Sequence, residues 1–167
     1  MFEELRFQLE GANWCLEFSA AANSTMYTHA QTGCNSRESV GQLYTRDLTG
    51  ETVEIELATW MKPKFASWGR VKFDTKKAFA ERIALFEQGY HCIGIWHTHP
   101  EPYPSPSSED RTLARDYAKS AQTQLDGIVF VIVGTLAPPD CYKVWVDDSK
   151  ELLLARRIEM RSMPRAG

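Results

Sequence analysis

The stretch that decides how this chain is interpreted occupies residues 97–110 and reads HTHPEPYPSPSSED. Two histidines, His97 and His99, stand one residue apart, and Asp110 follows eleven residues after the second. Side chains alternate along a strand, so both histidines point to one side if a strand ends here. A proline-rich connection can bring Asp110 back to them if it lies in the first turn of a helix. Two imidazoles and one carboxylate are a catalytic zinc set, whose fourth position is open for water.

Length and composition indicate one globular domain, which we expect to span residues 1–167. The net charge is −3, and no basic tract that would follow phosphates is present, which argues against nucleic acid as the main partner. No apolar run is long enough to span a bilayer, which argues against a membrane. The acidic N-terminus lacks the apolar region of a signal peptide. We therefore expect a cytoplasmic protein.

The cysteines are far apart and form no C-x-x-C pair; they are Cys15, Cys34, Cys92 and Cys141. This spacing argues against a structural zinc knuckle, and a disulfide framework would need an oxidising compartment. We expect reduced and mostly buried thiols.

The hydrophobic pattern predicts an α/β domain. Apolar residues that alternate or run together predict strands at residues 2–9, 14–18, 39–47, 51–60, 91–96, 128–133 and 142–146. Helical spacing predicts helices at residues 19–31, 75–89 and 107–123. Residues 151–160 fit either a helix or a strand. The expected architecture is a mixed, mostly antiparallel sheet with two long helices on its faces.

Several local details follow from turn and capping residues. The strands on either side of Leu48-Thr49-Gly50 are expected to form a hairpin. Gly33 is expected to end the first helix, and Thr75 to cap the second, which Gly89 ends. Residues 162–167 are expected to form a frayed tail.

Taken alone, H-x-H is a weak signal, because two histidines on a strand are more often partly buried polar residues than ligands. The rest of the stretch strengthens it. The prolines between residues 100 and 106 restrict the connection. Ser107 and Asp110 lie three apart at a helix start, which places them near one end of that helix and on neighbouring faces.

The pattern H-x-H-P, six residues, S-x-x-D resembles that of the JAMM/MPN-domain metalloproteases. The residues that match it with the expected spacing are His97, His99, Pro100, Ser107 and Asp110. A helix before the H-x-H strand, a helix beginning at the serine and a strong apolar strand after it also fit that fold. The resemblance covers roughly residues 20–147 and implies a single-domain MPN (JAB) fold.

The resemblance implies a role for each matched residue. His97, His99 and Asp110 look like the ligands of Zn²⁺, with a water as the fourth ligand, whose pKa the metal lowers to about 7. Ser107 matches the serine that helps hold the tetrahedral intermediate, an oxyanion-stabilising role that is compatible with capping the helix.

The family also needs an upstream glutamate that takes the proton from the water and passes it to the leaving amine. It usually precedes a strand, in a pattern like Glu-Thr/Ser-Gly-Gly followed by apolar residues. Residues 38–41 (ESVG) match this pattern, so Glu38 is the candidate, although Val40 replaces the usual first glycine. The competing glutamates read as a turn residue and a solvated strand face, and they are Glu51, Glu54 and Glu56.

Other residues near these motifs have less specific interpretations. His29 and His91 are expected to be surface or supporting residues rather than ligands. In proteins of the resembled family, the loop after the second hairpin strand often helps hold the extended tail of the substrate. Here Trp60, Phe65 and Trp68 could provide apolar contacts for such a tail or could complete the core.

The resemblance implies a zinc isopeptidase or peptidase that cuts after the C-terminal glycine of a ubiquitin-like protein, releasing it from a lysine or trimming a precursor. In size and motif the chain is similar to short bacterial members encoded beside homologues of ubiquitin-activating and ubiquitin-conjugating enzymes in antiphage operons. The expected partners are therefore a ubiquitin-like protein, its conjugates and those enzyme homologues. Two alternatives stay open: a non-catalytic MPN scaffold, whose members typically lack the zinc ligands, and a zinc hydrolase acting on a small molecule or a sulfur-carrier protein.

Overall fold

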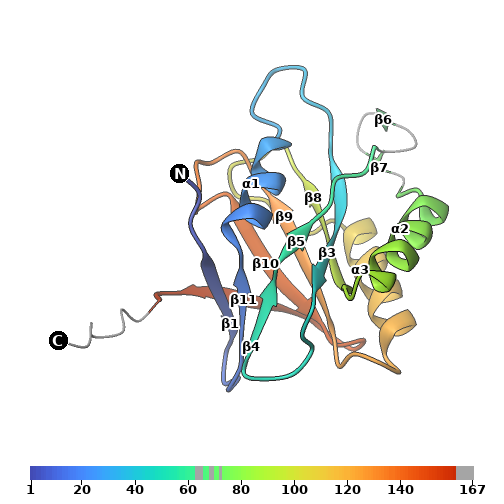
Figure 1. The fold of residues 1–167 in the computed structure, drawn as a ribbon. Coiled ribbons are helices and arrows are strands. Elements are labelled where there is room, and N and C mark those ends of the chain that lie inside the picture. The colour runs from blue at the N-terminus through green and yellow to red at the C-terminus, as the bar shows by residue number, and fades with distance from the viewer. Residues whose placement is uncertain (63–65, 68–69, 72, 161–167) are drawn as a thin grey trace.

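A computed structural model of the chain describes residues 1–62, 66–67, 70–71 and 73–160. Its strands are β1 (Leu5–Leu9), β2 (Cys15–Phe18), β3 (Val40–Thr45), β4 (Thr52–Ile55), β5 (Leu57–Ala58), β6 (Ala66–Ser67), β7 (Arg70–Val71), β8 (His91–Thr98), β9 (Ile128–Val133), β10 (Tyr142–Asp147) and β11 (Leu152–Ile158). Its helices are α1 (Ala20–Thr28), α2 (Thr75–Glu87) and α3 (Ser108–Ala121). Figure 1 shows α1 on one side of the sheet, with α2 and α3 on the other.

The main sheet has nine strands in the order β4-β2-β1-β11-β10-β9-β8-β3-β5. Neighbouring strands are antiparallel except for the pairs β2/β4 and β8/β9, which are parallel. The expected mixed, mostly antiparallel sheet flanked by helices is confirmed. The strands predicted at residues 2–9 and 14–18 are confirmed as β1 and β2, which pair antiparallel, and residues 151–160, which fitted either state, contain strand β11.

The two ends of this sheet belong to one continuous segment. Strands β4 and β5 lie at opposite ends of the strand order, yet only Glu56 separates them. Ser19 N donates to Ile55 O at 3.1 Å on one side, and Glu56 N donates to Tyr44 O at 3.0 Å on the other. The sheet therefore rolls until its edges meet, which protects edge strands that would otherwise expose unpaired backbone groups.

The predicted hairpin around Leu48-Thr49-Gly50 is consequently wrong in its first half. Residues 51–60 do not form one strand, because Thr52–Ile55 pair in parallel with β2 instead of returning along β3. Only Leu57–Ala58 pair with β3 as expected. A hairpin is favoured by local turn chemistry, but here the long-range pairing with β2 takes up the first four strand residues.

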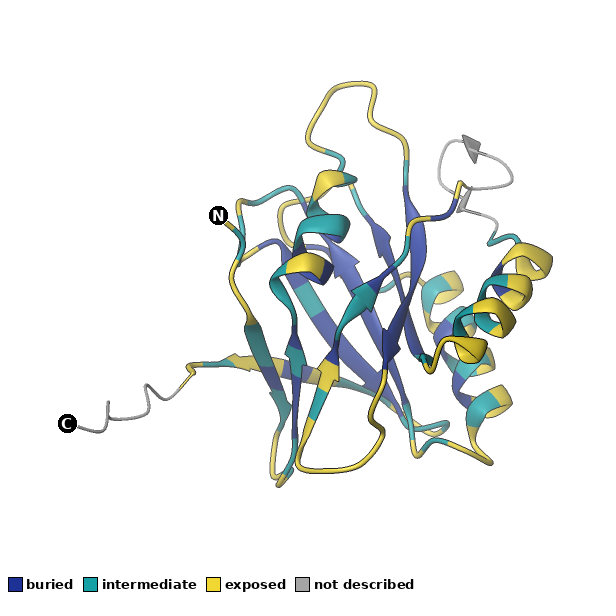
Figure 2. Cartoon of the chain, viewed as in Figure 1, coloured by how far each residue is buried: buried dark blue, intermediate teal, exposed yellow. Residues whose placement is uncertain are grey.

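The core has two layers, because central strands bury side chains on both faces. Val131 and Trp96 lie in the cluster enclosed by the rolled sheet and α1. Phe130 and Ile95 lie in the cluster between the sheet and α3, where Ala114 lets the helix approach closely. Figure 2 shows this pattern as dark blue central strands beneath partly exposed helices. Burying an aromatic side chain such as Phe130 stabilises the fold by about 2–3 kcal/mol.

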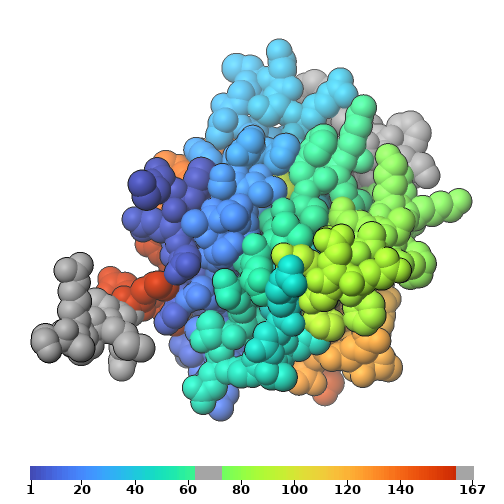
Figure 3. Space-filling view, in the orientation of Figure 1, coloured from blue at the N-terminus to red at the C-terminus, as the bar shows by residue number. Residues whose placement is uncertain are grey.

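Helix α2 is held to the sheet by a polar contact on its inner face. The Glu81 carboxylate accepts hydrogen bonds from the hydroxyls of Tyr44 at 2.8 Å and Thr59 at 2.6 Å. Its outer face carries large apolar side chains that are about half exposed or more: Phe79, Ile83 and Phe86. In Figure 3 this helix, in yellow-green, forms a broad part of the visible surface.

The helix boundaries differ from the predicted ones at two points. Asp74, not Thr75, caps α2, because its carboxylate accepts the backbone N–H of Lys77 at 3.2 Å. Helix α1 ends at Thr28, before Gly33, and the backbone N–H of His29 closes its last turn. The predicted tail at residues 162–167 lies outside the described residues. All four cysteines are free; Cys15 and Cys141 are buried, while Cys34 is exposed.

Gly41 in β3 is required by a close approach between strands. A Cβ atom at this position would lie 1.7 Å from Thr59 O and 2.4 Å from Trp96 Nε1. We predict that Gly41→Ala lowers the free energy of unfolding by about 3 kcal/mol, because the strands must separate. Urea denaturation measures this change in the free energy of unfolding. Gly33→Ala is the matched control, since its Cβ would meet only the movable Ser36 hydroxyl at 3.0 Å. Equal midpoints for the two variants would contradict the prediction.

Candidate metal centre

Strand β8 delivers the two histidines from the middle of the sheet. Its residues pair with β3 on one side and β9 on the other, and His97 lies opposite Val40 and Ile132. Because side chains alternate, His97 lies on the same face as Ile95, toward α3. Its side chain is buried and packs against the ring of Phe130, with centroids 5.2 Å apart. His99 follows the strand, and its N–H donates to Val133 O at 3.0 Å.

The proline-rich connection after His99 is fastened to the end of β9. Thr135 N donates to Glu101 O at 3.0 Å, and Pro104 is buried. Gly134 allows this contact, because a Cβ there would lie 2.6 Å from Glu101 O and 2.8 Å from the Pro104 ring. The loop thus has a defined path back to the start of α3.

A capping box at the start of α3 orients Asp110. The Ser107 hydroxyl oxygen accepts the Asp110 N–H at 3.1 Å, and Asp110 Oδ2 accepts the Ser107 N–H at 2.8 Å. The same carboxylate reaches both imidazoles: Oδ1 lies 3.1 Å from His97 Nε2, and Oδ2 lies 3.3 Å from His99 Nε2. The structure therefore brings together the four residues of the 97–110 stretch that the sequence singled out.

These groups perturb one another's pKa values. Burial raises the pKa of Asp110, but hydrogen bonds from both histidines outweigh it and hold that pKa well below its usual range. Burial lowers the pKa of His97 despite the nearby Asp110. For His99, burial acts in the same direction, but the hydrogen bond and charge of Asp110, with Glu38 and Glu101, raise its pKa. Asp110 is thus an ionised carboxylate suited to a cation.

Glu38 faces the histidines from the segment that leads into β3. Its carboxylate and one ring nitrogen from each of His97 and His99 all lie within 4.8 Å of one another. Burial, together with the charge of Asp110, raises the pKa of Glu38 to about 7, although His99 acts in the opposite direction. Two carboxyls in one site therefore have pKa values that are pushed far apart, a pattern typical of groups with different chemical roles.

The site lies in a cleft of about 490 Å³ that both polar and apolar residues line. The apolar lining residues are Val40, Phe73, Ile95, Trp96, Pro100 and Leu113. Two further acids, Glu101 and Glu109, lie along the cleft with the motif residues. These apolar residues could not be grouped from the sequence, because they come from separate elements and have no common spacing.

The donor set fits a zinc ion. Ligand atoms about 2.0–2.1 Å from a tetrahedral zinc lie about 3.3 Å from each other. Here His97 Nε2 and His99 Nε2 are 2.9 Å apart, and the two distances to Asp110 are 3.1 and 3.3 Å. Two imidazoles and a carboxylate are also the right kinds of donor, and the cleft leaves access for a fourth ligand.

The departure at Val40 from the resembled pattern has a structural explanation. Val40 is buried with Met61 and Ala78, and its side chain also lines the cleft, so a side chain is accommodated there. Gly41, which does match, is the position where a Cβ would overlap Thr59. The segment 38–41 therefore keeps the glycine on which the strand packing depends.

The remaining candidates lie outside the metal centre. His29 stacks on Trp60 with ring centroids 4.8 Å apart, and burial lowers its pKa. His91 begins β8, at the opposite end from His97, where it contacts Phe86. Trp60 remains 45% exposed, so it does not simply complete the core. The contacts predicted for Phe65 and Trp68 concern positions outside the described residues.

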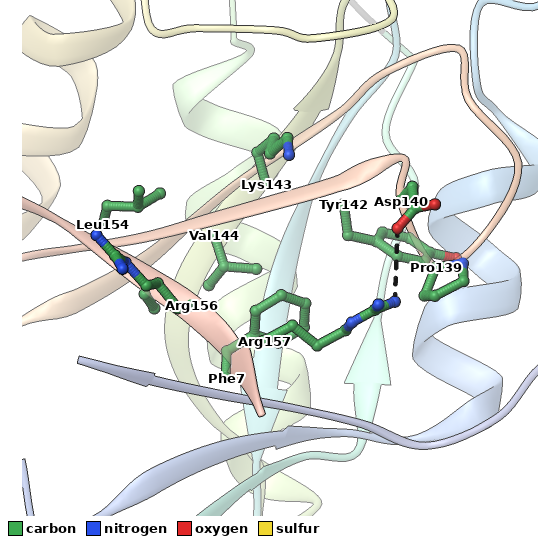
Figure 4. A pocket seen from close by; sticks show the side chains of 10 residues that line it. Phe7, Pro139, Asp140, Tyr142, Lys143, Val144, Leu154, Arg156 and Arg157 are labelled. Atoms are coloured by element: carbon green, nitrogen blue, oxygen red, sulfur yellow. Dashed lines mark ion pairs between the residues drawn. The ribbon is translucent and has the colours of Figure 1, made fainter. Parts of the chain in front are cut away.

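A second hollow of about 240 Å³ lies on β10 and β11, where the two strands diverge (Figure 4). Ala155 is the last β11 residue that pairs with β10, and the strand then continues along β1. Arg157 extends from this strand to Asp140, 3.6 Å away. None of the residues that line it belongs to the 97–110 stretch.

The fold is that of a JAB/MPN-type domain, and its cleft brings together two histidines and carboxylates of the kind that hold a metal ion. Residues 19–147 match the family of prokaryotic homologs of the JAB domain, and the chain belongs to this family. No curated protein matches the chain. Among the described residues, no helix is long and apolar enough to cross a membrane.

The chain is also similar to solved structures. One is the solution structure of protein DSY2949 from Desulfitobacterium hafniense, with a TM-score of 0.61 and 18% identity, covering 85% of this chain and 88% of that one. Another is AF2198, a JAB1/MPN domain protein from Archaeoglobus fulgidus, with a TM-score of 0.45 and 16% identity, covering 86% and 94%. At this identity the first similarity shows a shared fold.

Replacing a ligand tests the metal centre. We predict that Asp110→Ala weakens zinc binding at least 100-fold, because it removes one donor and the group that orients both imidazoles. Competition against a chromophoric chelator measures this. His91→Ala, on the same strand but at its other end, is the matched control and should bind like the wild type. Undiminished binding by the Asp110 variant would exclude this site.

Proposed function

We propose that this protein is a zinc-dependent isopeptidase or peptidase that cleaves after the C-terminal glycine of a ubiquitin-like protein. One observation carries the proposal. A carboxyl with a raised pKa, Glu38, faces two histidines and an ionised carboxylate in a cleft. Metal-dependent amide hydrolysis of this kind uses two acids in different roles, because one exchanges protons while the other binds the metal. Family membership supports the same chemistry.

Each residue has a defined task in this mechanism. Zinc bound by His97, His99 and Asp110 would act as a Lewis acid and lower the pKa of water to about 7. Glu38 takes a proton from the attacking water and delivers it to the departing lysine nitrogen. In the metal-free site burial raises its pKa to about 7, so this carboxyl takes up a proton more readily near neutral pH than an exposed glutamate does. The Ser107 oxygen accepts from Asp110 N, so its hydroxyl hydrogen can donate to the developing oxyanion.

A protein substrate accounts for surface features that a small molecule would not. Helix α2 begins two residues after Phe73, which lines the cleft, and it exposes Phe79, Ile83 and Phe86. Exposed apolar side chains gathered on one element are typical of protein contact surfaces. We propose a ubiquitin-like protein and its conjugates as partners, with homologues of ubiquitin-activating and ubiquitin-conjugating enzymes, in a bacterial antiphage system in the cytoplasm.

A non-catalytic scaffold is the main competing class. A scaffold needs neither a cluster of metal-binding side chains nor an acid with a raised pKa, so the grouping of His97, His99 and Asp110 and the raised pKa of Glu38 favour the hydrolase. A hydrolase for a sulfur-carrier protein or a small molecule would use the same metal centre. Cleavage assays on ubiquitin-like fusions, with and without a chelator, separate these functions.

Glu38 is tested by removing its charge without changing its size. We predict that Glu38→Gln still binds zinc but cleaves a ubiquitin-like fusion 10²- to 10⁴-fold more slowly, a range of about 3–5 kcal/mol in transition-state stabilisation, because the proton carrier is lost. Single-turnover cleavage with metal analysis measures both properties. Glu54→Gln is the matched control and should cleave at the wild-type rate. Wild-type cleavage by Glu38→Gln would mean that another base acts.

Ser107 has two roles that different substitutions separate. Glycine is a tolerable N-cap, so Ser107→Gly should change the free energy of unfolding by only about 0.5 kcal/mol. It lacks the hydroxyl donor, so cleavage should fall roughly 100-fold at unchanged zinc content. Thermal denaturation and steady-state kinetics measure the two effects. Ser107→Thr, which keeps a hydroxyl, should restore most of the activity; a fully active glycine variant would remove Ser107 from the mechanism.

A further inference from the structure

Thr98, between the two histidines, points away from the metal centre and into the protein. Neighbouring strand residues face opposite sides, so Thr98 lies on the side opposite His97 and is fully buried. Two hydrogen bonds join it to Ser39. Thr98 Oγ1 accepts the Ser39 N–H at 2.9 Å, and Thr98 N donates to Ser39 O at 3.0 Å. Thr98 is therefore tied to the residue that directly follows Glu38.

Gln31 completes this arrangement from the loop after α1. Its Oε1 atom accepts the Thr98 hydroxyl hydrogen at 2.9 Å, and its Nε2 atom donates to Ser36 O at 3.3 Å. A threonine hydroxyl has one hydrogen and two lone pairs. Because Gln31 takes the hydrogen, a lone pair is directed at the Ser39 N–H. A continuous chain of hydrogen bonds, the relay, therefore runs from Gln31 through Thr98 to Ser39.

Glu38 itself lies outside regular structure, since β3 begins two residues later. The ladder that aligns β3 with β8 starts at Val40 and His97, so it does not hold the residues before it. The bonds between Ser39 and Thr98 extend that alignment by one residue, to the neighbour of Glu38. One is a backbone hydrogen bond and the other uses the Thr98 side chain, and both join the residue next to Glu38 to the histidine strand.

We propose that Thr98 and Gln31 are positioning residues that hold the Glu38 carboxylate opposite the histidine pair. The expected loss of turnover rests on the proposed function, but the hydrogen bonds that position Glu38 can be tested without any catalysis. A misplacement of about 1 Å in a reacting group can reduce a rate roughly 100-fold. Loss of the relay should therefore lower turnover without lowering metal or substrate binding.

The structural part is tested by amide hydrogen exchange in metal-free protein. Thr98→Val keeps the shape of the side chain but removes the hydroxyl. We expect the Ser39 amide to exchange about tenfold faster in this variant, since one hydrogen bond is lost. Thr98→Ser keeps the hydroxyl and should retain the wild-type exchange rate. An unchanged Ser39 exchange rate in the valine variant would overturn the proposal, whatever the protein cleaves.

The functional part is tested by kinetics on a ubiquitin-like fusion. We expect Thr98→Val to lower kcat roughly 10- to 100-fold with KM and zinc affinity within about twofold of the wild type. Thr98→Ser should recover most of kcat, a rescue that a purely structural role would not require. Gln31→Leu, at a half-buried loop position, tests the relay if the valine variant fails to fold, and it should lower kcat in the same way.

The outcomes separate this proposal from the proposed function. If the wild type cleaves and both Thr98→Val and Gln31→Leu keep its kcat, the positioning role is wrong while the protease function stands. If Thr98→Ser has as low a kcat as Thr98→Val, the hydroxyl is not what positions Glu38, and the proposal also fails. If the wild type cleaves no ubiquitin-like fusion, the proposed function fails, and the Ser39 exchange rates alone decide whether the relay exists.

Discussion

The candidate metal centre depends on one carboxylate that interacts with three partners at once. Asp110 accepts the Ser107 N–H, which completes the cap of α3, and its two oxygens face His97 Nε2 and His99 Nε2. A rotation that improved one contact would weaken another, so the helix start and the strand end are fixed relative to each other. Gly134 contributes from a third element, because its missing side chain lets the intervening loop pack on β9.

The second constraint is electrostatic. Glu38 and Asp110 share one cleft, but only Asp110 receives hydrogen bonds from both histidines and from a helix N-terminus. Those interactions stabilise its ionised form. For Glu38, burial is the largest influence on the pKa, and the charge of Asp110 also opposes its ionisation. The ionised state of Asp110 thus helps keep the pKa of Glu38 high, and this difference is why the proposed mechanism gives the two acids separate roles.

The parts of the site that could be predicted from the sequence are those that are close along the chain. Residues 97–110 form one strand, loop and helix start, so spacing and capping chemistry were sufficient to associate His97, His99 and Asp110. Glu38 required the resemblance, because nothing local connects it to residues 59 or more positions away. Thr98 was visible between the histidines, but the role of its hydroxyl depends on Gln31, which carries no signal of its own. The rolled sheet could not be predicted for a similar reason. The turn before β4 favours a hairpin with β3, and only the long-range pairing of β4 with β2 prevents that hairpin.

This difference in chain distance has a consequence for how such a site can change. The proposed ligands are joined by a short connection that the capping box and Gly134 stabilise locally, so the candidate metal centre depends on few long-range contacts. Glu38 depends instead on the register of β3 against β8, on the close approach at Gly41 and on the bonds of Ser39 to Thr98. A small shift in these contacts would move the Glu38 carboxyl and leave His97, His99 and Asp110 in place. In the proposed mechanism, proton transfer is therefore less robust than metal binding, because the two are maintained by separate sets of interactions.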